Sequence, residues 1–398
     1  MNVTMNERVL TRMPMSELSR RWALVQARLK ERNLDALVIL GSDDFLGGYV
    51  RWLIDRPAYN AYHLAIICYP DDLMTIIEHG PLGGSRTGDG SDPDYPGVGE
   101  VLQTSAFRSI HYLHGAEGEL VSSALRRRDC RRIGMAGMGG MPHRFVSIIA
   151  DIPGIEISDM TDDLDRMKAI KSAAEIFEIR KTAAMQDEIF RHVLENARPG
   201  MRDCDIVAIA QAEGRRLGSE GGVFFCGSAP RGEPAPFRLN HWQMRTINPG
   251  DPVTLLIENN GPGGYYTELG RTIVFGKAPS KLLDAFEIAR QAQLATLARM
   301  TPGAACAEIA DAHDRFLEGH GLAPERRLYA HSQGYDVVES PLVRADEPGH
   351  VEAGMNMAVH PHFIDRHACG YICDNYVIDA DGPGTCLHAT EKKVFELG

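Results

Sequence analysis

Residues 264–272 read GYYTELGRT, and this stretch decides the fold together with the segments around it. It follows a Gly-Asp pair at 250–251 and precedes HSQGYDVVESP at residues 331–341. Farther toward the N-terminus lie MKAIKSAAE at 167–175 and PGM at 199–201. Because several spaced segments occur in a fixed order, they give a stronger fold signal than any one of them alone.

The chain around this stretch contains a repeated pattern of helices and strands. A Ser-x-x-Glu capping box at Ser172 predicts the start of a helix, and Pro199-Gly200 ends it. A second helix is expected over 202–217, followed by a strand over 221–226. The same order recurs around Pro302-Gly303. Two such units predict a pseudo-twofold α+β domain with a cleft where the two halves meet.

The N-terminal part of the chain has a different pattern. An amphipathic helix over 16–33 precedes short apolar runs that are typical of strands, at 36–40, 65–69, 74–77 and 133–135. Alternating helices and strands predict an α/β domain. We therefore expect an N-terminal α/β domain over residues 1–162 and a second domain over 163–398.

Composition excludes several classes of protein. The 398 residues carry 42 Lys and Arg against 54 Asp and Glu, a net charge of -12, and no long basic run, so we expect no nucleic-acid partner. The apolar runs have the length of strands, so we expect no membrane span. Eight scattered cysteines are typical of reduced thiols, which predicts a cytoplasmic protein.

The ordered segments described above resemble the pita-bread superfamily, which includes aminopeptidase P, prolidase, methionine aminopeptidase and creatinase. The resemblance covers roughly residues 165–398, and the preceding α/β domain fits the aminopeptidase P and creatinase branch. It implies a creatinase/aminopeptidase-type catalytic domain with a pseudo-twofold pita-bread fold. Fold alone does not establish the reaction, which has to be argued from the site.

The peptidases of this superfamily bind two metal ions through two Asp, one His and two Glu. Of these ligands only the histidine is kept, as His331. The first Asp falls near Leu256 or Ile257, with Glu258 adjacent and the spacing one residue off, so the placement of Glu258 stays open. The other three positions correspond to Glu268, His360 and Cys373. Bridging carboxylates are needed for two hard ions, so the resemblance predicts a member that lacks the two-metal centre.

The favoured function is therefore that of a creatinase-like, metal-independent hydrolase with no cofactor. It would act on a C–N bond, of amide, amidine or urea type, in a small polar metabolite. His241 is the first candidate for the acid–base group, because a histidine titrates near neutral pH. Glu258 and Glu268 would bind or stabilise charge, or act as nucleophile.

The resemblance also suggests residues that bind the substrate. Creatinase-like enzymes are homodimers in which the N-terminal domain of one subunit completes the pocket of the other, and the loop over 43–62 has a suitable composition. The candidates for contact with the substrate are His331, His360, Tyr266, Arg271 and Glu339, with Arg51 and Trp52 from the partner's loop.

Three alternatives stay open. One Zn or Fe ion held by Glu268, His331, His360 and Cys373 would give a mononuclear hydrolase similar to an Xaa-Pro dipeptidase, or a lyase of the same fold. A true Xaa-Pro dipeptidase is the second alternative, and a non-catalytic binding protein is the third. The sequence does not name the substrate, nor does it decide between hydrolysis and elimination.

Overall fold

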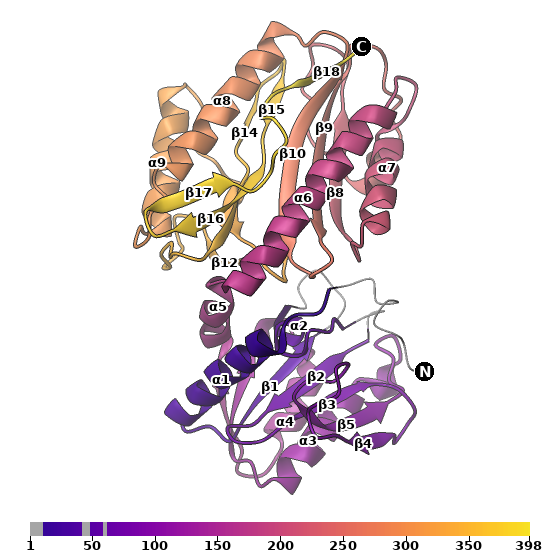
Figure 1. Ribbon diagram of the computed structural model, residues 1–398, viewed down its shortest axis with the longest axis vertical. Helices are drawn as coiled ribbons and strands as arrows, with labels where there is room; N and C mark the ends of the chain where they lie inside the picture. The colour runs from indigo at the N-terminus through magenta and orange to yellow at the C-terminus, as the bar shows by residue number, and fades with distance from the viewer. Residues whose placement is uncertain (1–10, 42–47, 59–61) are drawn as a thin grey trace. The chain divides into compact units, whose positions relative to one another are not determined.

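The structure is a computed structural model that describes residues 11–41, 48–58 and 62–398 (Figure 1). Its contacts separate two compact units, which we describe one at a time. The N-terminal unit is Arg12–Lys168, and the C-terminal unit contains Ala169–Gly398. No helix within the described ranges has both the length and the apolar character that a membrane crossing requires.

The N-terminal unit is a mixed sheet of seven strands with helices packed on it, as expected for an α/β domain. The strand order is β4-β5-β3-β2-β1-β6-β7. The strands are β1 (Ala36–Gly41), β2 (Leu64–Cys68), β3 (Met74–His79), β4 (Ser85–Thr87), β5 (Val98–Thr104), β6 (Arg132–Ala136) and β7 (Glu156–Asp159). The helices are α1 (Met15–Glu31), α2 (Gly48–Ile54), α3 (Ala116–Arg127), α4 (His143–Ala150) and α5 (Thr161–Ala169).

The division between the units lies after Lys168, beyond the predicted boundary at residue 162. The reason is visible at Asp163 in α5, whose carboxylate forms ion pairs with Arg28 (2.6 Å) and Arg32 (2.9 Å) at the end of α1. Asp163 is buried, so these pairs tie most of α5 to the N-terminal unit.

The C-terminal unit contains two main sheets, ordered β18-β10-β9-β8 and β12-β11-β13-β16-β17, and the two-stranded β14-β15. Its helices are α6 (Ala173–Asn196), α7 (Asp203–Arg216), α8 (Ser280–Leu297) and α9 (Cys306–Gly319). The strands are β8 (Gly222–Ser228), β9 (Pro252–Asn260), β10 (Tyr266–Phe275), β11 (Ala330–Ser332), β12 (Glu339–Leu342), β13 (Asn356–Val359), β14 (His362–Ile364), β15 (Cys369–Tyr371), β16 (Asp374–Asp379), β17 (Gly382–Cys386) and β18 (Phe395–Leu397).

The predicted internal repeat is present, and its two turns have the same construction. Gly200 and Gly303 both adopt positive φ, at 93° and 90°. The amide of Gly200 donates to the carbonyl of Ile247, and that of Gly303 to Val351, each at 2.8 Å. The turn between α6 and α7 therefore corresponds to the turn between α8 and α9, as a pseudo-twofold fold requires.

The two main sheets meet at Gly270 of β10. Its backbone exchanges two hydrogen bonds of 3.1 Å with Cys373, which lies just before β16. A Cβ atom at Gly270 would lie 2.3 Å from the Tyr371 ring and 2.9 Å from the Cys373 side chain. Glycine is therefore required here, and this close approach brings Cys373 beside the polar residues of β10.

Candidate active site

Two glutamates lie opposite each other on neighbouring strands of the C-terminal unit. Glu258 of β9 and Glu268 of β10 are direct antiparallel partners, so their side chains share one face of the sheet. Ile257, the alternative position at the irregular spacing, packs in the hydrophobic core between the sheet and helices α6 and α7. The structure thus assigns Glu258, and not Ile257, to the site.

Two histidines and a cysteine complete the group around Glu268. His331 Nε2 lies 3.0 Å from Glu268 Oε1, and the Cys373 thiol donates to Glu268 Oε2 at 3.3 Å. The ring of His360 packs edge-on against that of His331, with centroids 5.2 Å apart. We call Glu258, Glu268, His331 and His360 the glutamate–histidine cluster; all four are buried. The His360 Nε2 atom of this cluster has no hydrogen-bond partner among the described residues.

The amide of Gln333 lies between the two carboxyl groups. Its Nε2 is 3.0 Å from Glu258 Oε1 and 2.8 Å from Glu268 Oε1. Asn375 fixes this orientation: its Oδ1 accepts from the backbone N–H of Glu268 at 2.7 Å, so its Nδ2 has to face Gln333 Oε1, at 2.9 Å. Because a backbone N–H can only donate, the whole chain of amides has one direction. Gln333 therefore presents its two N–H groups to three acceptors, the two glutamates and the carbonyl of Val337, which lies 2.9 Å away.

Burial and the interactions among these residues shift their pKa values in different directions. Burial and the neighbouring Glu268 raise the pKa of Glu258 well above its usual value. Burial also acts to raise the pKa of Glu268, but His360 and His331 outweigh it and lower that pKa. Burial acts to lower the pKa of His331, but the hydrogen bond and charge of Glu268 outweigh it and raise that pKa.

The pKa of the remaining histidine, His360, is shifted in the opposite direction to that of His331. Burial, together with His331 and Arg327, lowers the pKa of His360 to about 4, although Glu268 acts to raise it. These directions favour the protonated form of Glu258, the ionised forms of Glu268 and His331, and the neutral imidazole of His360. Such a separation of pKa values is typical of acid–base sites.

These residues do not fit a pair of metal ions bridged by carboxylates. A bridging ion has to bind oxygens of both carboxyl groups, but the Gln333 Nε2 atom lies within hydrogen-bond distance of both. The pKa of Glu258 is raised, and the Cys373 thiol donates to the second oxygen of Glu268. Hard ions require deprotonated oxygen ligands, so this donor set disfavours a dinuclear centre.

A single ion fits better. Glu268, His331 and His360 offer donor atoms that all lie within 4.8 Å of one another. Two imidazoles and one carboxylate are a known ligand set for catalytic zinc, and the unpartnered His360 Nε2 provides a free donor. A second group, Asp374, Cys386 and His388, also has compatible donors. There the cationic side chains of Arg271 and Lys392 already face Asp374, which disfavours another cation.

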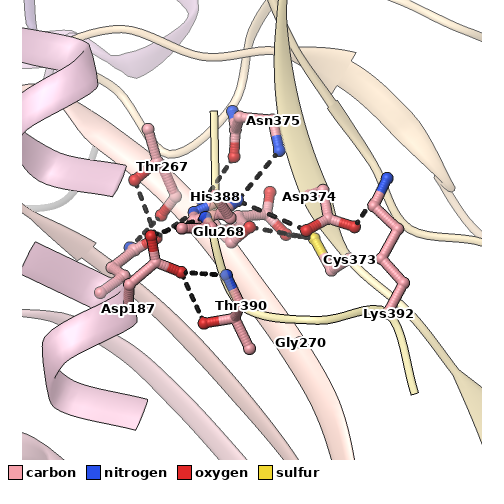
Figure 2. A network of polar contacts seen from close by, with 12 residues as sticks. Asp187, Thr267, Glu268, Gly270, Cys373, Asp374, Asn375, His388, Thr390 and Lys392 are labelled. Carbon is pink, nitrogen blue, oxygen red and sulfur yellow. Dashed lines mark hydrogen bonds and ion pairs between the residues drawn. The ribbon is translucent and has the colours of Figure 1, made fainter. Parts of the chain in front are cut away.

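The network beside the cluster holds its two strands in place (Figure 2). His388 lies 2.9 Å from Gln186 Oε1 and 3.6 Å from Asp374 Oδ1. Gln186 of α6 in turn donates to the carbonyl of Thr267 at 2.6 Å and to the side chain of Asn259 at 3.0 Å. Thr267 and Asn259 adjoin Glu268 and Glu258, so one side chain of α6 supports both glutamate positions.

Several predicted substrate contacts have other roles in the structure. Arg271 is buried, and its five N–H groups donate to Asp374 and to the carbonyls of Gly270, Cys373, Thr390 and Glu391. Glu339 accepts from the buried Lys171 ammonium at 2.8 Å. Tyr266 is buried on β10, where its backbone N–H donates to the carbonyl of Gly334. Because every N–H group of Arg271 already has an acceptor, a structural role is favoured over contact with the substrate.

Other predicted residues lie away from the cluster. His241 is on the exposed 3₁₀ turn Asn240–Trp242, where its ring packs against Trp242, and no contact joins it to the cluster among the described residues. Trp52 is only 1% exposed and Arg51 5%, both within the N-terminal unit. Their burial favours packing over contact with a substrate in a partner subunit. Parts of the predicted loop, residues 43–47 and 59–61, lie outside the described residues.

Sequence reasoning missed Gln333 and Asn375, the two amides that organise the cluster. A signal was available for each. Gln333 lies two residues after His331 within the motif, and Asn375 lies two residues after Cys373, so each is close in sequence to a position already recognised.

Comparisons with known proteins support this architecture. Residues 178–380 match the model of metallopeptidase family M24. The chain is 25% identical over 313 residues to an uncharacterized peptidase, YqhT, of Bacillus subtilis, covering 74% of this chain and 83% of that protein. It is 27% identical over 226 residues to a probable dipeptidase, PepE, of Mycobacterium tuberculosis, covering 56% and 59%.

A solved structure agrees in fold over nearly the whole chain. The X-Pro aminopeptidase from Thermotoga maritima superposes with a TM-score of 0.78 at 15% identity, covering 95% of this chain and 99% of that one. This likeness confirms the two-domain pita-bread fold. Together with the family match, it leads to one conclusion: the chain belongs to metallopeptidase family M24.

Proposed function

We propose that this chain is a hydrolase that cleaves a C–N bond, of amide, amidine or urea type, in a small polar metabolite. We further propose that it does so without the two bridged metal ions of a dinuclear peptidase. The family and the curated relatives, described as peptidases, support hydrolysis. The observation that carries the second part is the Gln333 amide nitrogen, which lies within hydrogen-bond distance of both Glu258 and Glu268.

The cluster provides a complementary acid and base. The raised pKa of Glu258 favours its protonated form, which can give a proton to a leaving nitrogen. The lowered pKa of His360 favours its neutral form, whose Nε2 can accept a proton from an attacking water. The negative charge of Glu268 acts to raise the pKa of His360 and so stabilises the proton that His360 takes up.

The Glu268–His331 pair would orient the polar substrate. It offers a carboxylate and an imidazolium 3.0 Å apart, held by Cys373 and Gln333. Fixed charges of both signs suit a small zwitterionic or polar group, because they need little rearrangement when the substrate binds. In this proposal the acid–base histidine is His360 in place of His241.

The test is a turnover screen with and without a metal chelator. The panel contains small amides, amidines, ureas and cyclic amides, and Xaa-Pro dipeptides. We expect turnover of a non-peptide member that chelator leaves unchanged. Turnover of Xaa-Pro dipeptides alone, dependent on two added metal equivalents, would contradict the proposal. A ligand that raises the melting temperature with no turnover in the panel would instead favour a binding protein.

One observation favours a second candidate, a mononuclear metal-dependent hydrolase or lyase. Glu268, His331 and His360 would hold one zinc or iron ion. Such an ion polarises a substrate carbonyl and makes nearby water more acidic. Glu258 would remain the proton donor, and Gln333 would still orient both carboxyl groups. Loss of turnover with chelator, restored by a single metal equivalent, would support this candidate.

A homodimer also remains a proposal. Its support is an exposed apolar segment in which Leu239, Trp242 and Met244 are 62–65% exposed, because apolar surface of this kind often marks an interface. Light scattering coupled to gel filtration should give twice the chain mass, and Trp242→Ser should shift it toward the monomer. A monomer in the wild-type protein would contradict the proposal.

A further inference from the structure

The N-terminal unit contains a cavity that the glutamate–histidine cluster does not use. Its volume is about 410 Å³, within the range of pockets that bind small molecules. The first turns of α3 and α4 line it, at Glu117 and at His143 and Arg144. The cavity is large enough for a ligand of metabolite size.

Its polar wall is predominantly basic. Five lining residues are basic: His63, Arg108, His114, His143 and Arg144. The guanidinium groups of Arg108 and Arg144 form no hydrogen bond or ion pair with any residue that the structure describes. The single acidic lining residue, Glu117, is buried and lies 3.5 Å from His63. In a chain with a net charge of -12, these two guanidinium groups form a local concentration of positive charge.

Its apolar wall consists of Phe107 together with Ala106, Leu113 and Pro142. Phe107 lines the cavity and is 42% exposed. It is supported by edge-on contacts with His79 and Tyr62, at centroid distances of 5.2 and 5.8 Å. Those two rings stack on each other at 3.9 Å. A supported aromatic surface favours a planar apolar group in the ligand.

We propose that this cavity binds a small organic anion with a planar apolar body, namely an aromatic or heteroaromatic carboxylate or phosphate. Arg108 and Arg144 would bind the anionic group, because guanidinium forks match carboxylate and phosphate oxygens. Phe107 would contact the ring. The proposal does not depend on the function of the glutamate–histidine cluster, since every residue that carries it lies in the N-terminal unit.

The experiment is calorimetric titration of the full-length protein with a panel of benzoate, indole-3-acetate and phenyl phosphate. Benzyl alcohol serves as the neutral counterpart and inorganic phosphate as the anion without a ring. We expect at least one aromatic anion to bind more tightly than both. The double variant Arg108→Ala/Arg144→Ala should weaken it about tenfold or more, since charge-assisted hydrogen bonds are lost. Phe107→Ala should weaken it less.

The matched control is Arg299→Ala, an exposed arginine of the C-terminal unit, which should bind the anion as the wild type does. All three arginines are exposed, so melting temperatures without ligand should stay unchanged. Binding of no panel member would overturn the proposal, and so would equal affinity in the double variant. Equal affinity for inorganic phosphate would overturn the role of the aromatic wall.

Discussion

Two buried polar centres lie side by side on strand β10, and they differ in how completely their groups are paired. Around Arg271, three residues beyond Glu268, all five guanidinium N–H groups have acceptors. Around Glu268, the neighbouring His360 Nε2 has no hydrogen-bond partner among the described residues, and the pKa of Glu258 is raised. Buried polar groups without partners cost stability. We call the centre around Glu268 the open centre and that around Arg271 the closed centre; this difference supports the proposed functional role of the first and a structural role of the second.

The pKa shifts of the ionisable residues also differ between the two centres. Burial acts to raise the pKa of Asp374, but Arg271, His388 and Lys392 outweigh it and hold that pKa far below its usual value. Asp374 is therefore a permanent carboxylate beside a permanent guanidinium. Glu258 has its pKa raised and His360 has its pKa lowered, so the neutral form of each is favoured and each can exchange a proton. Substitutions in either centre test this difference.

The largest expected effect is on turnover, in the open centre. His360→Ala removes the acceptor of the water proton, and we expect turnover to fall by about 10²–10⁴-fold, the usual contribution of general acid–base catalysis. The folded state should be retained, because Nε2 makes no hydrogen bond to a described residue. Steady-state kinetics on the substrate found by the turnover screen measure this change.

The matched control is His367→Ala, an exposed histidine of the same unit, which should keep full activity. Circular dichroism should show both variants folded. Wild-type turnover in folded His360→Ala would remove His360 from the mechanism.

The second effect is on stability, in the closed centre. Asp374→Asn leaves the Arg271 charge buried without its counter-ion, which should lower the free energy of unfolding by about 3–5 kcal/mol. Urea unfolding followed by fluorescence measures it. The double variant Arg271→Met/Asp374→Leu should recover much of the loss, because no isolated charge remains. A loss below about 1 kcal/mol in Asp374→Asn would show that the centre is not a structural ion pair.

The third effect is on metal binding. Gln333→Ala removes the amide that donates to both glutamates, so we expect the cluster to bind Mn²⁺ at least about tenfold more tightly than the wild type. Isothermal titration with Mn²⁺ measures the affinity. Gln291→Ala, which changes an exposed amide on α8, is the control and should behave as the wild type. Unchanged affinity in folded Gln333→Ala would mean that the amide does not exclude cations.

The smallest effect is expected at His241. Its ring is exposed, and no contact joins it to the cluster among the described residues. His241→Ala should therefore change turnover by less than about twofold, as is usual for exposed substitutions away from a site. The same kinetic assay measures it. A loss comparable to that of His360→Ala would restore His241 as the acid–base group.

Much of the fold was predictable, because it depends on local signals. The capping box at Ser172 begins α6, with hydrogen bonds of 2.7 and 3.2 Å between Ser172 and Glu175. The Pro-Gly turns ended the predicted helices at the correct places. Three strands of the N-terminal unit, β4, β5 and β7, were missed: β5 contains a glycine, and the side chains of β4 and most of those of β7 are exposed, so none gives a clear apolar run.

The site was predictable where a motif fixed a position, and less so where pairing decided it. Glu268, His331, His360 and Cys373 do meet in the structure. Glu258 could not be separated from Ile257, because a shift of one residue in a strand turns every side chain to the other face. Only the register of β9 against β10 resolves it. The role of Gln333 depends on Asn375, 42 residues away, and no local pattern predicts that contact.

The most direct test of the central claim is the metal content of the purified, tag-free protein. Elemental mass spectrometry should follow incubation with Mn²⁺, Zn²⁺ or Fe²⁺ and removal of free ions. The account predicts well below one bound ion per chain, with hydrolysis unaffected by chelator. One ion per chain would favour the second candidate function, that of a mononuclear metal-dependent hydrolase or lyase. Two ions per chain would contradict the central claim, because the Gln333 amide could then not lie between Glu258 and Glu268.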